Sequence, residues 1–171
     1  MKFKPEIIYI QRLLKETKIK EIMTVPVIKI NDNDTVSRAQ ELFVEHGIYY
    51  LPVVNRLNEL VGVVTHKYLY KTVAPRKNMG NEMAGYSPDV VYDGDSFYER
   101  DKLDQFKLTR IMNPNPVTLR PDDSVAEAVL TMTRKNTGCI PIIKANRKIC
   151  GILTHKDIVD LATLILLEEV Q

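Results

Sequence analysis

The chain contains the same seven-residue pattern twice, and this internal repeat constrains the fold more than any other feature. The pattern reads GVVTHKY over residues 62–68 and GILTHKD over residues 151–157, so the copies are separated by 151 − 62 = 89 residues. The same offset aligns residues 19–73 with residues 108–162 without a gap. A gapless repeat of this length predicts two copies of one structural unit.

Within the pattern, an apolar strand is expected to run directly into a helix. The glycine at its start has no side chain, so another backbone or a ligand can approach closely. Thr154 followed three residues later by Asp157 predicts a capping box at a helix N-terminus. Free backbone N–H groups and the helix dipole at such a junction favour an anion such as a phosphate. A plain helix cap without a ligand explains the same residues, and both interpretations stay open here.

Composition limits the class of protein. The length of 171 residues fits one domain or two small lobes, and an apolar fraction of 44% supports a buried core. The net charge is only +2, which argues against a nucleic-acid or membrane-surface protein. Cys139 and Cys150 form no CxxC pair, and buried free thiols are expected. No signal peptide or membrane span is predicted, so we expect a cytoplasmic protein.

The chain in order predicts strand, helix, strand, strand and helix in each repeat. A lead-in helix is expected over residues 5–16. In repeat one, Val27, Ile28 and Ile30 predict a strand, and Asp34-Thr35 predicts the cap of a helix that ends at Gly47. Asn136 occupies the position of Gly47 in repeat two.

Two apolar runs then predict a hairpin in each repeat. In repeat one they span residues 51–54 and 60–64. Pro52 and Pro141 are expected at a strand start or a sheet edge, because proline cannot donate to a ladder. The resulting fold class is α+β.

This order and these residues resemble the cystathionine-β-synthase (CBS) domain, present as a tandem pair or Bateman module. The resemblance rests on the apolar-Pro-apolar-apolar strands at 51–54 and 140–143 and on the Gly-apolar-apolar-Thr-x-x-Asp pattern. It implies two repeats, 19–73 and 108–162, related by a pseudo-twofold axis. The remaining segments are a lead-in helix (1–18), an inter-repeat insertion or linker (74–107) and a C-terminal helix extension (163–171).

The resemblance further implies a regulatory module that binds an adenosine-containing ligand, such as AMP, ADP, ATP or S-adenosylmethionine, in clefts between the repeats. Asp157 would accept hydrogen bonds from the ribose hydroxyls. Carried over residue by residue, the main cleft would comprise Thr154, Asp157, His155, Lys156, Ile152, Met23, Val27, Ile28, Ile48, Tyr49, Tyr50 and Pro52. The second cleft would comprise Thr65, His66, Lys67, Met112, Val117, Thr137, Gly138, Cys139 and Pro141.

The second cleft is expected to bind more weakly, because Tyr68 stands where repeat two has Asp157. No catalytic residue, metal ligand or cofactor is expected. The sequence has no Walker-type loop, no metal-ligand cluster and no nucleophile with a plausible histidine partner. The enzyme interpretation is therefore the least favoured, whereas a structural dimerisation module without a ligand stays open.

A homodimer is expected because the last helix, over residues 156–168, is apolar nearly all round and needs burial on more than one side. CBS pairs associate through their helices, which would supply the second face. Regulation would act on a separate effector protein. Residues 74–107 fit a solvated linker, although they carry several apolar residues; Asp93 and Asp95 are out of register with a calcium loop.

Overall fold

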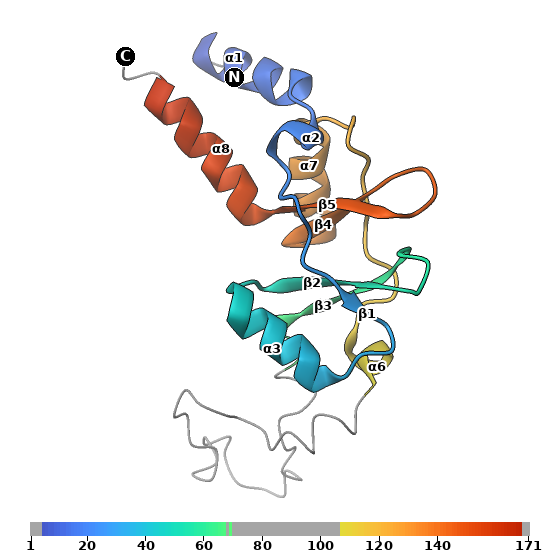
Figure 1. The fold of residues 1–171 in the computed structure, drawn as a ribbon. Helices are drawn as coiled ribbons and strands as arrows, with labels where there is room; N and C mark the ends of the chain where they lie inside the picture. The colour runs from blue at the N-terminus through green and yellow to red at the C-terminus, as the bar shows by residue number, and fades with distance from the viewer. Residues whose placement is uncertain (1–4, 68, 70–106, 169–171) are drawn as a thin grey trace, which may run out of the picture.

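The computed structural model describes residues 5–67, 69 and 107–168. Tyr68 and all but one residue of the expected inter-repeat segment 74–107 lie outside the described residues, so the expectations for them remain predictions. Two lobes, each with a small sheet and helices, are stacked one above the other (Figure 1). The architecture is α+β, with two repeats as expected.

The first lobe contains the sheet β1-β2-β3 and helix α3. Strand β1 (Ile30–Asn31) runs parallel to β2 (Tyr50–Val54), which is antiparallel to β3 (Leu60–Thr65). Helix α3 (Val36–His46) starts where the Thr35 side chain accepts a hydrogen bond from the N–H of Arg38, and it ends at Gly47 with φ of 60°. Both helix limits match the sequence prediction. The predicted first strand was placed too early, because Val27 and Ile28 lie outside β1.

The second lobe repeats this plan with a smaller sheet. Helix α7 (Val125–Lys135) is capped by Ser124 and ends at Asn136, whose φ is 48°. Strands β4 (Cys139–Ile143) and β5 (Ile149–Thr154) form an antiparallel pair, and α8 (His155–Glu168) follows directly. The counterpart of β1 is reduced to one parallel bridge, between Leu119 and Ile142.

Pro52 and Pro141 occupy the third position of β2 and β4 rather than a strand start. Pro52 lies in the middle strand of its sheet. In repeat two the Leu119 N–H donates to the Pro141 carbonyl at 3.3 Å, and the Ile143 N–H donates to the Leu119 carbonyl at 3.0 Å. The backbone N–H and C=O groups of Leu119 are thus both paired with β4, and neither bond needs an N–H from the proline. A proline is tolerated inside the strand for this reason.

The first helix of each repeat packs in the lobe of the other repeat. Helix α2 (Ile19–Ile22) begins repeat one, yet Ile19 is fully buried in the core of repeat two with Met132, Ile140 and Leu153. Helix α6 (Leu108–Ile111) begins repeat two and packs in the core of repeat one. Each lobe therefore completes its core with a segment from the other repeat.

The contacts between the lobes follow a pseudo-twofold axis. The bridge between Lys18 and Ser124 has its repeat-related counterpart in the bridge between Thr35 and Lys107. The bridge between Glu59 and Lys148 joins two equivalent residues, so the axis passes close to it. A buried junction of Val63, Cys139 and Ile152, with Val27 and Tyr50 packed against it, lies between the lobes.

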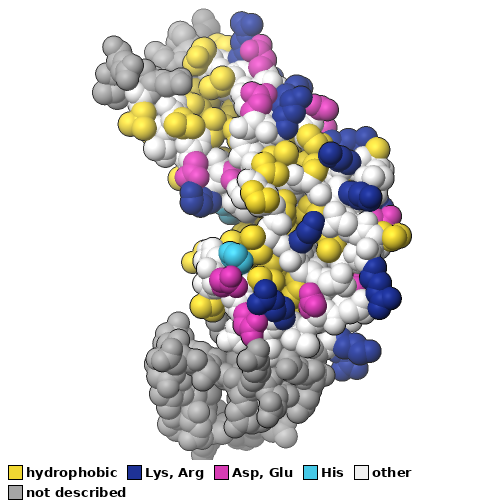
Figure 2. All heavy atoms as spheres, in the orientation of Figure 1, with side chains coloured by type: hydrophobic (Ala, Val, Ile, Leu, Met, Phe, Trp, Pro, Cys, Tyr) yellow, Lys and Arg dark blue, Asp and Glu magenta, His cyan; other side chains and the backbone are white. Residues whose placement is uncertain are grey.

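Two helices carry apolar side chains that the chain itself leaves exposed. In α8 these are Val159, Leu164, Leu166 and Leu167, each 60–64% exposed. Helix α1 (Pro5–Glu16) contacts α7 and exposes Ile8 and Tyr9. Apolar side chains gather over α1 and the end of α8 in the space-filling view (Figure 2). Contacts within the described chain thus bury only part of the α8 surface.

Candidate functional site

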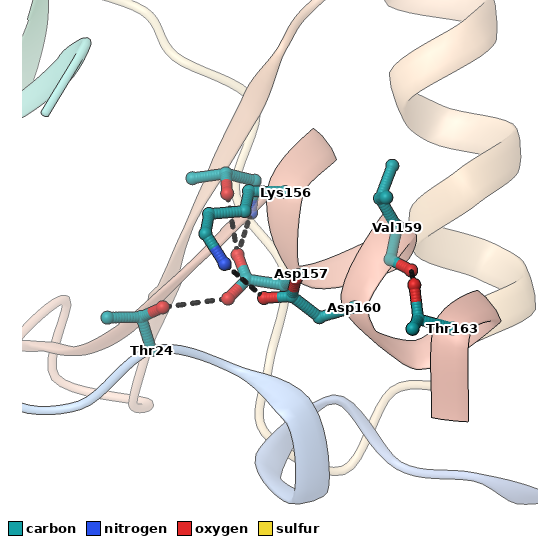
Figure 3. Close-up of polar contacts among 7 residues, drawn as sticks. Thr24, Lys156, Asp157, Val159, Asp160 and Thr163 are labelled. Carbon is teal, nitrogen blue, oxygen red and sulfur yellow. Dashed lines mark hydrogen bonds and ion pairs between the residues drawn. The ribbon is translucent and has the colours of Figure 1, made fainter. Parts of the chain in front are cut away.

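The turn from β5 into α8 is organised by the carboxylate of Asp157. One oxygen of this carboxylate, Oδ2, accepts hydrogen bonds from the Thr154 backbone N–H at 2.6 Å and from the Thr154 hydroxyl at 2.7 Å (Figure 3). The bond from the Thr154 N–H is one half of the capping box that the spacing predicts, whereas the Thr154 hydroxyl donates to the carboxylate instead of accepting from the Asp157 N–H. The carboxylate is consequently fixed at the positive end of the α8 dipole, at the edge of the inter-repeat junction.

A third donor reaches Asp157 from the residues that follow α2 in repeat one. The Thr24 hydroxyl donates to the other carboxylate oxygen, Oδ1, at 2.7 Å. Thr24 is itself held on β5, because its backbone exchanges hydrogen bonds of 2.9 and 3.2 Å with Ile152. We call Thr24, Thr154 and Asp157 the Asp157 cluster. A carboxylate offers about four acceptor positions, so three are occupied and about one remains.

The neighbouring charges of α8 compensate each other. The Lys156 ammonium pairs with Asp160 one turn along the helix at 2.5 Å (Figure 3). This contact raises the pKa of Lys156, mainly through the hydrogen bond to Asp160. The backbone N–H of His155 donates to the Gly138 carbonyl at 3.2 Å, while its side chain is exposed. On this side of the molecule the surface is indented between the start of α8 and α3 (Figure 2).

The other residues expected around Asp157 are spread over several environments. A Cβ built on Gly151 would lie 2.2 Å from the Met23 sulfur, so Met23 packs tightly over that glycine. Ile28 and Ile48 pack against the core of repeat one, and Pro52 is buried within β2. Val27 lies at the buried junction between the lobes. Met23 and Ile152 lie next to the Asp157 cluster, because Met23 precedes Thr24 and Ile152 exchanges backbone hydrogen bonds with Thr24.

A pocket of about 890 Å³ opens beside Thr65, the repeat-related counterpart of Thr154. We call it the Thr65 pocket. Seven of the nine residues expected in the second cleft line it, namely Thr65, His66, Lys67, Val117, Thr137, Gly138 and Cys139. Met112 instead packs over Gly62, and Pro141 is buried in β4. Tyr49 and Tyr50, expected in the main cleft, line this pocket.

Tyr50 spans the Thr65 pocket from one repeat to the other. Tyr50 pairs with Thr65 in the β2–β3 ladder. A Cβ built on Gly138 would lie 1.9 Å from the Tyr50 hydroxyl. Only a glycine at position 138 leaves room for the phenol ring in this orientation. Burial raises the pKa of Tyr50, so the phenol is neutral at physiological pH.

The histidine, tyrosine and cysteine side chains that burial affects in the Thr65 pocket are uncharged near neutral pH. His66 makes edge-to-face contacts with Phe43 and Tyr49, at centroid distances of 5.4 and 5.9 Å. Burial lowers the pKa of His66 and raises the pKa of Cys139 to about 12. A thiol that stays protonated is a poor nucleophile and a poor metal ligand. The formal charge among the described lining residues therefore comes from lysines.

Sequence reasoning missed several residues at both places. Thr24 was overlooked, because nothing in its local sequence shows that the start of repeat one packs on the lobe of repeat two. Six further residues line the Thr65 pocket and were not predicted: Asn113, Asn115, Pro116, Val63, Lys135 and Asn136. The adjacency of Val117 in the chain could have suggested the first three. The end of α7 is brought there only by tertiary packing.

Within the described residues, no group of three or more His, Cys, Asp or Glu side chains is arranged to hold a metal ion. Across residues 5–67, 69 and 107–168, helices also fall short of the length and apolar character needed to cross a membrane. Both cysteines of the chain are free thiols.

Comparison with known proteins gives a consistent family. A sequence model of the CBS domain matches residues 19–74 and 108–163. A CBS domain-containing protein of Dictyostelium discoideum is 28% identical over 148 residues, which cover 86% of this chain and 92% of that protein. A homoserine O-acetyltransferase of Methanococcus vannielii is 24% identical over 155 residues, covering 91% of this chain and 27% of that protein. An L-aspartate semialdehyde sulfurtransferase of Methanocaldococcus jannaschii is 25% identical over 142 residues, with coverage of 83% and 22%.

The last two matches involve proteins several times longer than the matched region, and their names describe those whole proteins. Among solved structures, a CBS domain pair in complex with 5′-methylthioadenosine and S-adenosyl-L-methionine aligns with a TM-score of 0.66 at 24% identity, covering 86% of this chain and 96% of that one. The structure of CBSX2 in complex with AMP aligns with a TM-score of 0.63 at 22% identity, covering 86% and 97%. At these identities the likeness shows the fold.

Proposed function

The chain belongs to the CBS domain family, and from this premise we propose that it is a regulatory module that senses an adenosine-containing ligand between its two repeats. Structures of similar fold contain AMP, 5′-methylthioadenosine or S-adenosylmethionine. These ligands share an adenosine whose ribose carries two neighbouring hydroxyl groups. The proposal therefore depends on a group that recognises ribose.

The observation that carries the proposal is the fixed carboxylate of Asp157. Thr154 and Thr24 hold it at the start of α8, where about one acceptor position remains free. Two ribose hydroxyls need two acceptor positions, so one of the threonine hydroxyls must turn away when a ribose binds. A threonine hydroxyl can do so by rotating about one bond, without moving the backbone.

Titration calorimetry of the purified chain with AMP, ATP and S-adenosylmethionine tests the proposal. We expect at least one of them to bind, with the Asp157 site dominant. Mass spectrometry of heat-released ligand should also detect an adenosine compound carried through purification. The absence of binding by all three ligands would contradict ligand sensing and favour the structural alternative.

The proposal excludes turnover by this chain. The buried Cys139 thiol has a pKa of about 12, and it is the only cysteine that lines the Thr65 pocket among the described residues. Incubation with ATP, AMP or S-adenosylmethionine should leave each compound unchanged. Ligand-dependent regulation would then act on a separate effector protein. We also propose a cytoplasmic location, since both thiols are unpaired, as in a reducing compartment.

A homodimer is the second part of the proposal. The apolar residues Val159, Leu164 and Leu167 of α8 are 60–62% exposed in the single chain, and burying such residues in a second copy would be favourable. Light scattering should give about twice the chain mass of 19.6 kDa. A Leu164→Glu, Leu167→Glu variant should give the monomer mass. A wild type that stays monomeric at micromolar concentration would contradict dimerisation without affecting the ligand proposal.

A further inference from the structure

The Thr65 pocket is lined by two lysines, one from each repeat. Lys67 belongs to the helical residues that follow β3, and Lys135 is the last residue of α7. Both line the pocket, whereas its described lining contains no aspartate or glutamate. Neither lysine takes part in an ion pair with any residue that the structure describes. Two positive charges therefore face a pocket of about 890 Å³ without compensation from its described walls.

The repeat-related positions carry the opposite balance. The counterpart of Lys67 is Lys156, whose ammonium is neutralised by Asp160 at 2.5 Å. The counterpart of Lys135 is His46. Asp157 then adds a carboxylate at the start of α8. The two places share one backbone plan, but the Thr65 pocket is positive and the Asp157 cluster carries an excess carboxylate.

The remaining polar groups of the Thr65 pocket suit oxygen-rich ligands. Asn113, Asn115 and Asn136 line it and offer side-chain amides that can donate hydrogen bonds. Tyr50 presents a neutral phenol. An ammonium group binds phosphate oxygens as a compact charge with up to three donors.

We infer that the Thr65 pocket selects a phosphate-bearing adenosine ligand, such as ATP or ADP, and rejects S-adenosylmethionine. This inference rests on the proposed function and names the ligand class of one of its sites. ATP would place its phosphates between Lys67 and Lys135. S-adenosylmethionine carries a sulfonium, an ammonium and a single carboxylate in the same region, so its net charge is positive and is repelled by the two lysines.

The test compares ATP and S-adenosylmethionine on the full chain by calorimetry, with the site assigned by NMR shifts of the Gly138 and Thr137 amides. In a Lys67→Gln, Lys135→Gln variant, ATP affinity at this site should fall about 100-fold, or about tenfold per charge-assisted contact. The same variant should bind S-adenosylmethionine no more weakly than the wild type does. Added salt should weaken ATP binding at this site, because screening acts on exposed charges.

Lys156→Gln is the matched control, because it removes the equivalent lysine of repeat two. It should leave ATP affinity at the Thr65 pocket unchanged, and all three lysines are exposed, so folding should be preserved. Equal affinity of ATP and S-adenosylmethionine at the pocket, or unchanged ATP binding in the double variant, would overturn the inference. Ligand binding confined to the Asp157 cluster would also overturn it, while leaving the proposed function intact. Failure of both ligands to bind anywhere would overturn both.

Discussion

The Asp157 cluster and the Thr65 pocket show how a duplicated backbone can carry two different chemistries. In both, a threonine ends the second strand of the hairpin, and the backbone N–H of the following histidine donates to the carbonyl of the residue before the first strand. These hydrogen bonds run from His155 to Gly138 and from His66 to Tyr49. The turn keeps Thr-His-Lys in both repeats, and the differences lie in the side chains around it. The repeat therefore preserves the junction, while substitution decides what the junction recognises.

The exchange of large and small side chains is the clearest difference. Repeat one has Tyr49 and Tyr50 where repeat two has Gly138 and Cys139. Tyr50 uses the space that Gly138 leaves, and Tyr49 remains 67% exposed beside His66. The missing side chain in one repeat thus accommodates the added ring in the other. This contact joins the two repeats within the wall of the Thr65 pocket.

The largest expected effect is the loss of ligand binding when Asp157 is replaced. In Asp157→Ala, affinity at this site should fall by roughly 10- to 150-fold, because hydrogen bonds to a charged acceptor contribute about 1.5–3 kcal/mol. Stability should fall by about 1 kcal/mol through loss of the cap. Asp157→Asn keeps one carbonyl oxygen for Thr154 and should recover the stability but not the affinity. Calorimetry and urea unfolding separate the two roles; unchanged binding in Asp157→Ala would make the carboxylate a helix cap only.

The next effect concerns the two glycines of the repeated pattern. Gly151→Ala should destabilise the fold by about 1–3 kcal/mol through overpacking, because the new Cβ would meet the Met23 side chain at 2.2 Å. A Met23→Ala background should relieve most of this cost. At Gly62 the Cβ would meet the Met112 sulfur at 2.6 Å and also the Asn113 carbonyl at 3.0 Å, so Met112→Ala should relieve less. Double-mutant cycles in urea measure both couplings; purely additive effects would contradict the predicted contacts.

A smaller effect is expected from the hydroxyl that Thr24 donates to Asp157. Thr24→Val should lower stability by about 0.5–1.5 kcal/mol, as for one hydrogen bond. It should nevertheless raise ligand affinity a few-fold, because an acceptor position of Asp157 becomes free. Thr24→Ser keeps the hydroxyl and is the matched control. A loss of affinity in Thr24→Val would show that this hydroxyl contacts the ligand instead of competing with it.

The smallest effect is the pH dependence that His66 contributes. Burial lowers the pKa of His66, so the unfolded chain takes up this proton at a higher pH than the folded chain. Its stabilising contribution is complete above the ordinary histidine pKa of about 6.5 and is lost as the pH falls through the folded value. The unfolding temperature should therefore change less between pH 7.5 and pH 5 in His66→Gln than in the wild type. His155→Gln, at the exposed counterpart, should follow the wild type; parallel curves for His66→Gln and wild type would contradict the assignment.

The sequence alone determined the elements and their limits wherever the cause is local. Gly47 and Asn136 adopt positive φ at the helix ends, Thr35 caps α3, and Asp157 caps α8 through Thr154, as their spacing predicts. These features depend on residues within a few positions of each other. The 89-residue repeat likewise indicated two equivalent lobes and the family, since identical patterns specify identical local structure.

Only the tertiary structure decided which segments meet. The exchange of α2 and α6 between the lobes places Thr24 on Asp157 and packs Met23 over Gly151. It also brings Asn113 and Asn115 to the Thr65 pocket together with Lys135 of α7. Residues about 130 positions apart, such as Thr24 and Asp157, leave no periodic signal of their contact. Their pairing follows from the burial of Ile19 and Leu108 in the opposite cores, a choice that long-range packing makes.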